Sequence, residues 1–178
     1  MRRDTCNAHV STFRPPPWGR LAACAGLAGP LFGGARRRPT RFSSRLVGRR
    51  PILTGLASRV ATRVGDLRTD GLGEGFDLVL VSAICHMLGP DENRDLLRRC
   101  RQALAAGGRV VVQDFILEQD KTAPKMAAVF SLNMLVGTER GASYNESEYA
   151  AWLGEAGFRE VHRIGLPGPS GLMIACVS

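Results

Sequence analysis

The chain has 178 residues, which suits one domain with a sizeable core, and its 44% hydrophobic and 22% charged residues are ordinary for a soluble globular protein. The formal net charge of +8 is unevenly distributed, because residues 1–64 hold 13 Arg and one acid whereas residues 65–178 hold 11 Lys or Arg and 15 acids. The second part is therefore mildly acidic, which argues against a nucleic-acid-binding surface on the folded domain.

The five cysteines are an odd number at scattered spacings without a Cys-x-x-Cys pair: Cys6, Cys24, Cys85, Cys100 and Cys176. This pattern argues against a disulfide framework or a zinc site and favours a reducing, cytoplasmic compartment. The three histidines, His9, His86 and His162, are too far apart in sequence to indicate a metal cluster. We therefore expect no metal.

Residues 1–50 form an Arg-, Pro- and Gly-rich segment without helical or strand periodicity, and we interpret it as irregular or disordered, with no assigned function. Its apolar stretch, 21–32, is broken by Pro30 and is too short to span a bilayer, so no membrane association is expected. The alternatives are a transit or signal peptide, a basic arm for an anionic partner, or translation of a GC-rich region in a wrong frame or from a wrong start.

From residue 51 the chain has the periodicities of a folded domain, which we assign to 51–178. We expect a short strand over 58–64, a turn over 65–75 and an apolar strand, buried on both faces, over 76–84. A helix opens at Pro90, and Gly107 and Gly108 end it. Its predicted buried stripe is Leu96, Leu97, Cys100 and Leu104.

The remaining elements are a strand over 109–117, a helix over 124–136, a helix over 145–156 that Asn145 caps, and strands over 158–164 and 171–177. This order predicts the α/β class with a mainly parallel sheet, in which the last two strands form an antiparallel hairpin at one edge. Ligands of open sheets bind outside the carboxyl ends of the strands. Asp66 and His86 follow two expected strands, so we expect both side chains to project into one shared hollow.

Five segments in sequence resemble the C-terminal half of the small-molecule O-methyltransferases that use S-adenosylmethionine, a family with plant phenol-methylating and bacterial tailoring enzymes. They are GDLRTD (65–70), FDLVLVSAICH (76–86), LLRRCRQALAAGGRVVVQDFIL (96–117), LNMLVGTERGASYNESEYAAWLGEAGF (132–158) and LPGPSGLMIA (166–175). The resemblance covers residues 51–178 and implies an incomplete Rossmann-like methyltransferase sheet, with S-adenosylmethionine as cofactor and a small-molecule hydroxyl as methyl acceptor.

The resemblance also implies roles for individual residues. Asp66 matches the acid that accepts a hydrogen bond from the adenine amino group, and Leu67 falls where an apolar side chain covers the adenine ring. Ser82 falls where plant members have a Lys near the cofactor. These three residues are the predicted cofactor-binding set.

The predicted catalytic residues are His86 and Asp114. His86 matches the family's general base, and Asp114 matches a Glu that flanks and orients this His, whereas a second flanking Glu is replaced by Ser143. A histidine ordinarily titrates near neutral pH, which suits it to remove a proton from a phenol. Because both residues come from the ends of adjacent strands, we expect them to meet over the sheet edge.

The family's glycine-rich cofactor turn is not evident ahead of Asp66. Residues 26–34 are glycine-rich, but no β-branched strand precedes them and no acid follows, and the family's helical dimerisation domain, which makes its members homodimers, is also not evident. One hypothesis is therefore an O-methyltransferase for a small aromatic or polyketide-like molecule, truncated and inactive if the turn is missing. The alternative is a non-catalytic, methyltransferase-like module whose basic arm binds an anionic partner.

Overall fold

The computed structural model describes residues 21–25 and 66–178. The chain divides into two compact units, one of residues 1–29 with 72–178 and one of residues 30–71. The strand expected over 58–64 lies outside the described residues, as does most of the segment 1–50. Within the described part, no helix is both long enough and apolar enough to cross a membrane.

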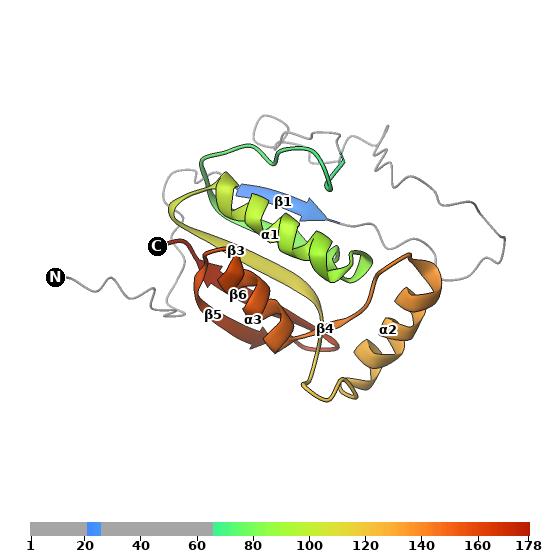
Figure 1. The fold of residues 1–178 in the computed structure, drawn as a ribbon. Helices are drawn as coiled ribbons and strands as arrows, with labels where there is room; N and C mark the ends of the chain where they lie inside the picture. Colours follow the sequence, from blue (N-terminus) through green and yellow to red (C-terminus); the bar gives the residue numbers. More distant parts are fainter. Residues whose placement is uncertain (1–20, 26–65) are drawn as a thin grey trace, which may run out of the picture. The chain divides into compact units, whose positions relative to one another are not determined.

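The first unit is built on one sheet with the strand order β1-β2-β3-β6-β5, and a short β4 pairs with β3 (Figure 1). The strands are β1 (Leu21–Ala25), β2 (Phe76–Ser82), β3 (Leu104–Leu117), β4 (Tyr144–Asn145), β5 (Arg159–Gly165) and β6 (Ser170–Cys176). β1, β2 and β3 are parallel, whereas β6 is antiparallel to both β3 and β5. The predicted α/β class and the antiparallel hairpin at one edge are therefore confirmed.

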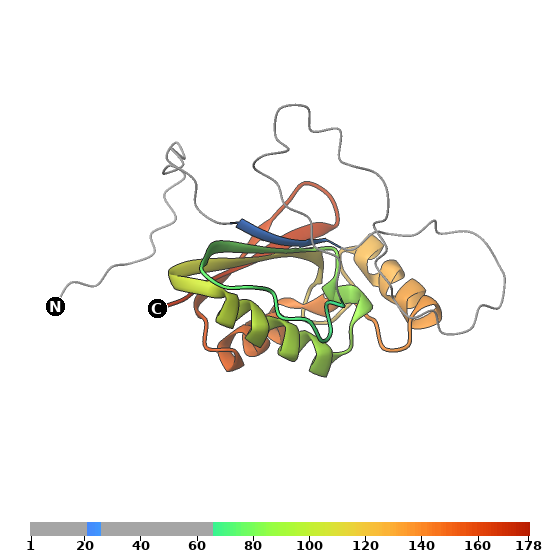
Figure 2. The same cartoon turned by 90° about the horizontal axis from the view of Figure 1, so that it is seen from above.

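Among the described residues, three α-helices and one short 3-10 helix connect strands β2 to β6: η1 (Cys85–Met87), α1 (Pro90–Ala103), α2 (Lys125–Gly137) and α3 (Glu146–Glu155). α1 and α3 lie side by side on one face of the sheet, as Figures 1 and 2 show, and Arg94 of α1 bonds Glu155 of α3 at 3.0 Å. α2 contacts η1 and β3 and lies beyond the end of the sheet (Figure 2).

The core lies between the sheet and the helices α1 and α3. On β2, Val79 and Val81 are fully buried, whereas Leu78 and Leu80 are only half-buried. Successive side chains of a strand point to opposite faces, and α1 and α3 cover one of them. The prediction that this strand is buried on both faces is therefore wrong within the described part of the chain.

Helix α1 ends earlier than its glycines predict. It stops at Ala103, and Leu104 is buried as the first residue of β3 rather than on the helix stripe. Gly107 and Gly108 lie within β3, where the pairing with β2 shifts register. A Cβ on Gly108 would come within 3.1 Å of the Phe76 carbonyl oxygen, so Gly108 marks a close approach of two strands. Gly107 has a φ of 74°, a conformation that favours glycine, and neither residue marks a helix end.

Strand β1 lies directly ahead of the glycine-rich residues 26–34, where the sequence analysis found no β-branched strand. It pairs in parallel with β2, from Leu21 opposite Leu78 to Ala25 opposite Ser82. Its sequence, LAACA, contains no β-branched or aromatic residue, so strand propensity alone does not reveal it. The segment 1–50 is therefore not irregular throughout.

Candidate functional site

His86 lies just beyond the carboxyl end of β2. The strand ends at Ser82, and Ala83 adopts a left-handed conformation with φ of 54° while its N–H donates to the Gln113 carbonyl at 2.9 Å. This backbone conformation is uncommon for a residue with a side chain. It turns the chain out of the sheet into η1, which carries His86.

Asp114 reaches His86 from the neighbouring strand. Residues Val110, Val112, Asp114 and Ile116 alternate along the buried face of β3, so Asp114 points toward the side covered by the helices. Its side chain is 1% exposed, so the carboxylate does not face water.

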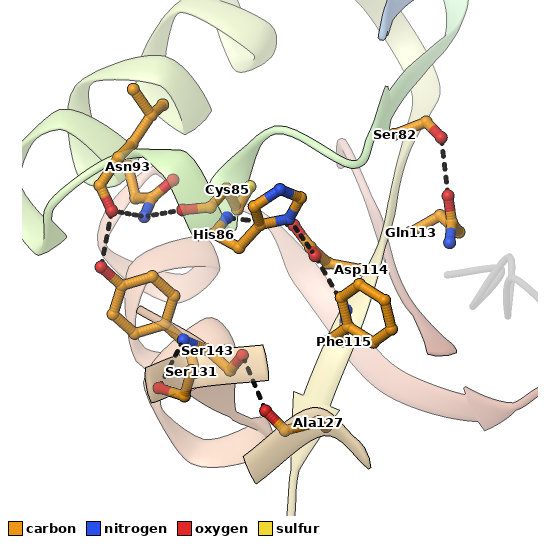
Figure 3. A network of polar contacts seen from close by, with 12 residues as sticks. Ser82, Cys85, His86, Asn93, Gln113, Asp114, Phe115, Ala127, Ser131 and Ser143 are labelled. Atoms are coloured by element: carbon orange, nitrogen blue, oxygen red, sulfur yellow. Dashed lines mark hydrogen bonds and ion pairs between the residues drawn. The ribbon is translucent and has the colours of Figure 1, made fainter. Parts of the chain in front are cut away.

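The two side chains make a close, buried pair (Figure 3). His86 Nδ1 lies 2.7 Å from Asp114 Oδ1, and the His86 backbone N–H donates to Asp114 Oδ2 at 3.1 Å. The Phe115 N–H also donates to Oδ1, at 2.8 Å. Because both carboxylate oxygens accept hydrogen bonds, Nδ1 is the donor and Nε2 is left as the acceptor. The expectation that the two residues meet over the sheet edge is confirmed.

Aromatic rings surround the imidazole. Phe130 of α2 meets it edge-on with ring centroids 4.9 Å apart, and Phe115 lies 6.2 Å away. The two phenyl rings are themselves 4.3 Å apart. These rings exclude water from one side of His86, which strengthens its hydrogen bonds to Asp114.

The turn that carries His86 is also held from α1 and β4. Asn93 Nδ2 donates to the carbonyl oxygens of Cys85 and Leu88 at 3.0 and 3.3 Å. The Tyr144 hydroxyl donates to the same Leu88 oxygen at 2.6 Å. Burial, with Glu148 nearby, raises the pKa of Tyr144 to about 12. The sequence analysis did not select Asn93. Its position on the same face of α1 as Leu96 and Leu97 could have indicated a buried polar residue.

Two further residues lie around this turn. A Cβ on Gly141 would collide with the His86 carbonyl oxygen and with Thr138 Oγ1, so this position requires glycine. Ser143, which the resemblance matches to a second flanking Glu, is buried and donates to the Ala127 carbonyl at 3.2 Å. Its hydroxyl therefore joins α2 rather than His86.

Ser82 lies apart from the His86–Asp114 pair. Its hydroxyl donates to Gln113 Oε1 at 2.6 Å. Gln113 and Asp114 are neighbours on β3 and point to opposite faces, so these contacts form two separate pairs (Figure 3).

Asp66 and Leu67 belong to the second unit, residues 30–71. The exposed carboxylate of Asp66 accepts the Arg68 N–H at 2.9 Å, and its backbone N–H donates to Asp70 Oδ2 at 2.8 Å. Asp66 therefore caps a turn, as Asp commonly does. Leu67 beside it is half-buried. The shared hollow of Asp66 and His86 stays a prediction, because the two residues lie in different units.

The His86–Asp114 pair can act as a proton acceptor. Nε2 can take a proton from a hydroxyl group, and the carboxylate beside Nδ1 stabilises the imidazolium that results. Within residues 66–178, no three or more His, Cys, Asp or Glu side chains are grouped to hold a metal ion. The geometry therefore favours general-base chemistry on a hydroxyl.

Comparison with known proteins points to one family. A family model for the O-methyltransferase domain matches residues 48–159. A curated relative, 3-hydroxy-5-methyl-1-naphthoate 3-O-methyltransferase of Streptomyces sahachiroi, is 39% identical over 130 residues, which are 72% of this chain and 37% of the relative.

Solved structures agree with this match. The methyltransferase PigF of a Serratia species, solved with SAH, is 31% identical with a TM-score of 0.65, over 71% of this chain and 38% of that one. An O-methyltransferase family 2 protein of Planctomyces limnophilus, solved with apigenin, is 26% identical with a TM-score of 0.65, over 70% and 38%. The chain thus spans less than two fifths of the length of these relatives.

Proposed function

The chain belongs to the O-methyltransferase domain family, and from this premise we propose that it transfers a methyl group from S-adenosylmethionine to a hydroxyl of a small aromatic or polyketide-like molecule. The observation that carries the proposal is the buried pair of His86 Nδ1 and Asp114 Oδ1, 2.7 Å apart at the carboxyl end of the sheet. The naphthoate acceptor named for one relative and the apigenin bound to another support the acceptor class.

In this proposal His86 is the general base. Its Nε2 accepts the proton of the acceptor hydroxyl, which makes the oxygen a better nucleophile, while Asp114 keeps the proton on Nδ1 and stabilises the charged ring. Such a base typically contributes about 10²–10⁴-fold to the rate. The remaining task is to hold the reacting atoms in line at near-attack distance.

We propose that Asp66, Leu67 and Ser82 hold the cofactor. S-adenosylmethionine, when bound, supplies the methyl group from a sulfonium, which is a good leaving group. The residues fit it chemically, because an exposed carboxylate can accept the hydrogens of an adenine amino group and a half-buried Leu offers an apolar surface. The Ser82 hydrogen is already donated to Gln113, so only its oxygen lone pairs are available.

Residues 51–178 are proposed as part of the catalytic domain. β1 adds a strand that pairs with β2 and ends directly before the glycine-rich residues 26–34. This order, a strand and then glycines, is the one expected for the family's cofactor turn. The activity of the whole chain, rather than its inactivity, is therefore the hypothesis to test.

The first experiment measures S-adenosylmethionine binding to the 178-residue chain by calorimetry. We expect Asp66→Ala to raise the dissociation constant about 10- to 100-fold, because a hydrogen bond to a charged group is lost. Asp120→Ala is the matched control, since Asp120 is an exposed carboxylate that caps a different turn through Thr122. The absence of binding to the unmodified chain would contradict the proposal.

The second experiment measures methyl transfer to apigenin by mass spectrometry. We expect His86→Ala to lower turnover about 10²–10⁴-fold while the dissociation constant of S-adenosylmethionine stays the same. His162→Ala is the control, because His162 lies on β5 and its ring Nδ1 is hydrogen-bonded to the Glu160 carbonyl, not to the candidate site. An equal loss of turnover and cofactor affinity in His86→Ala would indicate a structural His instead.

A further inference from the structure

We propose that Asn93 is a positioning residue for His86: its side-chain amide clamps both ends of the turn 85–88 and so keeps the imidazole against Asp114. The proposal rests on the proposed function for its catalytic meaning, because it assigns Asn93 to the support of the proposed base. Asn93 is completely buried, and its side-chain amide donates to the backbone of the turn.

The clamp spans the residue that it positions. Cys85 precedes His86 and Leu88 follows it by two residues, and Asn93 Nδ2 donates to both of their carbonyl oxygens, at 3.0 and 3.3 Å (Figure 3). The turn's own backbone bonds are few, from Met87 N to Ile84 O at 2.9 Å and from Leu88 N to Cys85 O at 3.2 Å. One amide group from α1 therefore closes a turn that is too short to hold itself firmly.

The side-chain amide of Asn93 is oriented so that its nitrogen faces the turn. Two carbonyl oxygens face it, and carbonyl oxygens require donors, so the nitrogen must be the atom that points at the turn. Oδ1 is buried, and no hydrogen-bond partner for it is found among the described residues. An apolar side chain would avoid this buried, unsatisfied oxygen. The position therefore uses Asn for its two N–H donors.

The same turn carries both hydrogen bonds of His86 to Asp114. One comes from the backbone N–H to Oδ2 and one from the ring Nδ1 to Oδ1, so a rotation of the turn would break the two together. Asp114 holds the turn from β3 and Asn93 holds it from α1. Loss of the Asn93 clamp should therefore free the imidazole ring even when the protein remains folded.

The test is NMR of the Nδ1–H proton of His86 in the 178-residue chain, assigned by its loss in His86→Gln. Asn93→Leu keeps most of the side-chain volume and removes both donors. We expect the proton to exchange with water at least about tenfold faster in this variant. Leu97→Ala is the control: Leu97 is fully buried one turn later on α1, so the variant loses packing and keeps the Asn93 amide. Unchanged exchange in Asn93→Leu would overturn the proposal.

A second measurement needs no variant and covers the case in which Asn93→Leu fails to fold. Both side-chain amide hydrogens of Asn93 should be protected from exchange in the unmodified chain, whereas those of the exposed Asn133 on α2 should exchange freely. Equal exchange at the two positions would overturn the proposal. Neither measurement uses cofactor or acceptor, so failure of the proposed function would leave these results unchanged.

If apigenin is methylated, a third readout separates positioning from simple stabilisation. Asn93→Leu should lower kcat about 10- to 100-fold at a temperature where it is fully folded, because a misplaced base loses its alignment. The KM for S-adenosylmethionine should stay the same, and Leu97→Ala should retain the original kcat. A parallel loss of kcat in both variants would contradict a positioning role.

Discussion

The carboxylate of Asp114, on β3, binds the proposed general base His86. It is buried on β3 and accepts from the backbone and the ring of His86 as well as from Phe115 N–H. A carboxylate that accepts three hydrogen bonds is fixed in place, and so is the ring that it holds. Changes to the hydrogen-bonding groups of this pair should therefore lower turnover.

Asp114→Asn tests this directly. The amide keeps the shape of the carboxylate but loses one acceptor oxygen and the negative charge that stabilises the imidazolium. We expect turnover with apigenin to fall about 10²–10⁴-fold while S-adenosylmethionine affinity is retained. Asp120→Asn, at an exposed turn, should behave like the unmodified chain. Undiminished turnover in Asp114→Asn would remove Asp114 from the proposed mechanism.

Gly141→Ala tests the other side of the same turn. The added Cβ would overlap the His86 carbonyl oxygen, which is backbone and cannot move aside without displacing the turn. Overpacking of this kind typically costs about 1–3 kcal/mol. We expect a lower urea midpoint together with lower turnover. A variant with unchanged midpoint and turnover would show that the turn can move without cost.

Helix α3 is stabilised by a capping box at its start and by the packing of its buried face. Asn145 caps it through Oδ1 to the Glu148 N–H at 2.9 Å, and the Glu148 carboxylate returns to the Asn145 N–H at 2.8 Å. The helix then buries Tyr149, Trp152 and Leu153 against the sheet side of the core. Its stability can therefore be changed at its start and at its exposed face independently.

Asn145→Ala removes the cap and half of the capping box. We expect the free energy of unfolding to fall by about 1 kcal/mol, within the range of 0.5–2 kcal/mol found for caps. Urea unfolding followed by circular dichroism measures this. A change smaller than the error of the midpoint would mean that Glu148 alone holds the helix start.

Gly154→Ala should act in the opposite direction. Gly154 is exposed within α3, and a Cβ there would meet no atom within 4 Å. Alanine reduces the freedom of the unfolded chain, so we expect about 0.4–1 kcal/mol of added stability in the same urea experiment. Destabilisation would indicate that α3 needs a glycine near its end.

In the molecule as a whole, an aromatic cluster connects α3 to the turn under His86. Tyr144, Tyr149 and Trp152 have ring centroids 4.8 to 6.1 Å apart, and the Tyr144 hydroxyl reaches Leu88. Burial raises the pKa of Tyr149 well above its usual value, and Cys85 adds to the effect. The folded state therefore favours the protonated form of both phenols, so the free energy of unfolding should fall as the pH rises into the alkaline range.

This dependence has a defined sign. The pKa of Tyr144 rises from 10.0 to about 12, so the folded state binds more protons than the unfolded state in this interval. The free energy of unfolding should be at its full value below pH 10 and fall as the pH rises toward about 12. Urea unfolding across this range should show a shallower decline in Tyr144→Phe, and shallower still with Tyr149→Phe added. Equal slopes in all three proteins would contradict the assignment.

Much of the architecture could be predicted from local pattern. The helix over 124–136, the Asn145 cap and the final hairpin are close to the observed α2, α3 and β5–β6. Strand β1 could not be predicted, because LAACA has neither alternation nor β-branching and becomes a strand only by pairing with β2. The end of α1 was placed too late, since Gly107 and Gly108 lie within β3 instead.

Some residues of the candidate site could likewise be predicted from the sequence, and others could not. His86 and Asp114 could be selected because the resemblance implies a base and its flanking acid at these two positions. Their contact was expected because they come from adjacent strands of one sheet. Asn93, Tyr144 and Gly141 could not, because their roles depend on backbone carbonyls of a turn that no sequence pattern reveals.

The amino-acid sequence alone thus determined the helices and strands from residue 76 onward, apart from the short β4, because hydrophobic periodicity and capping residues act over a few neighbouring positions. The tertiary structure alone determined which side chains donate hydrogen bonds to which backbone carbonyl oxygens. Contacts such as that of Asn93 with Leu88, or of Tyr144 with the same oxygen, join residues from separate elements whose approach depends on how the sheet and helices pack. Packing geometry, rather than residue type, places the imidazole.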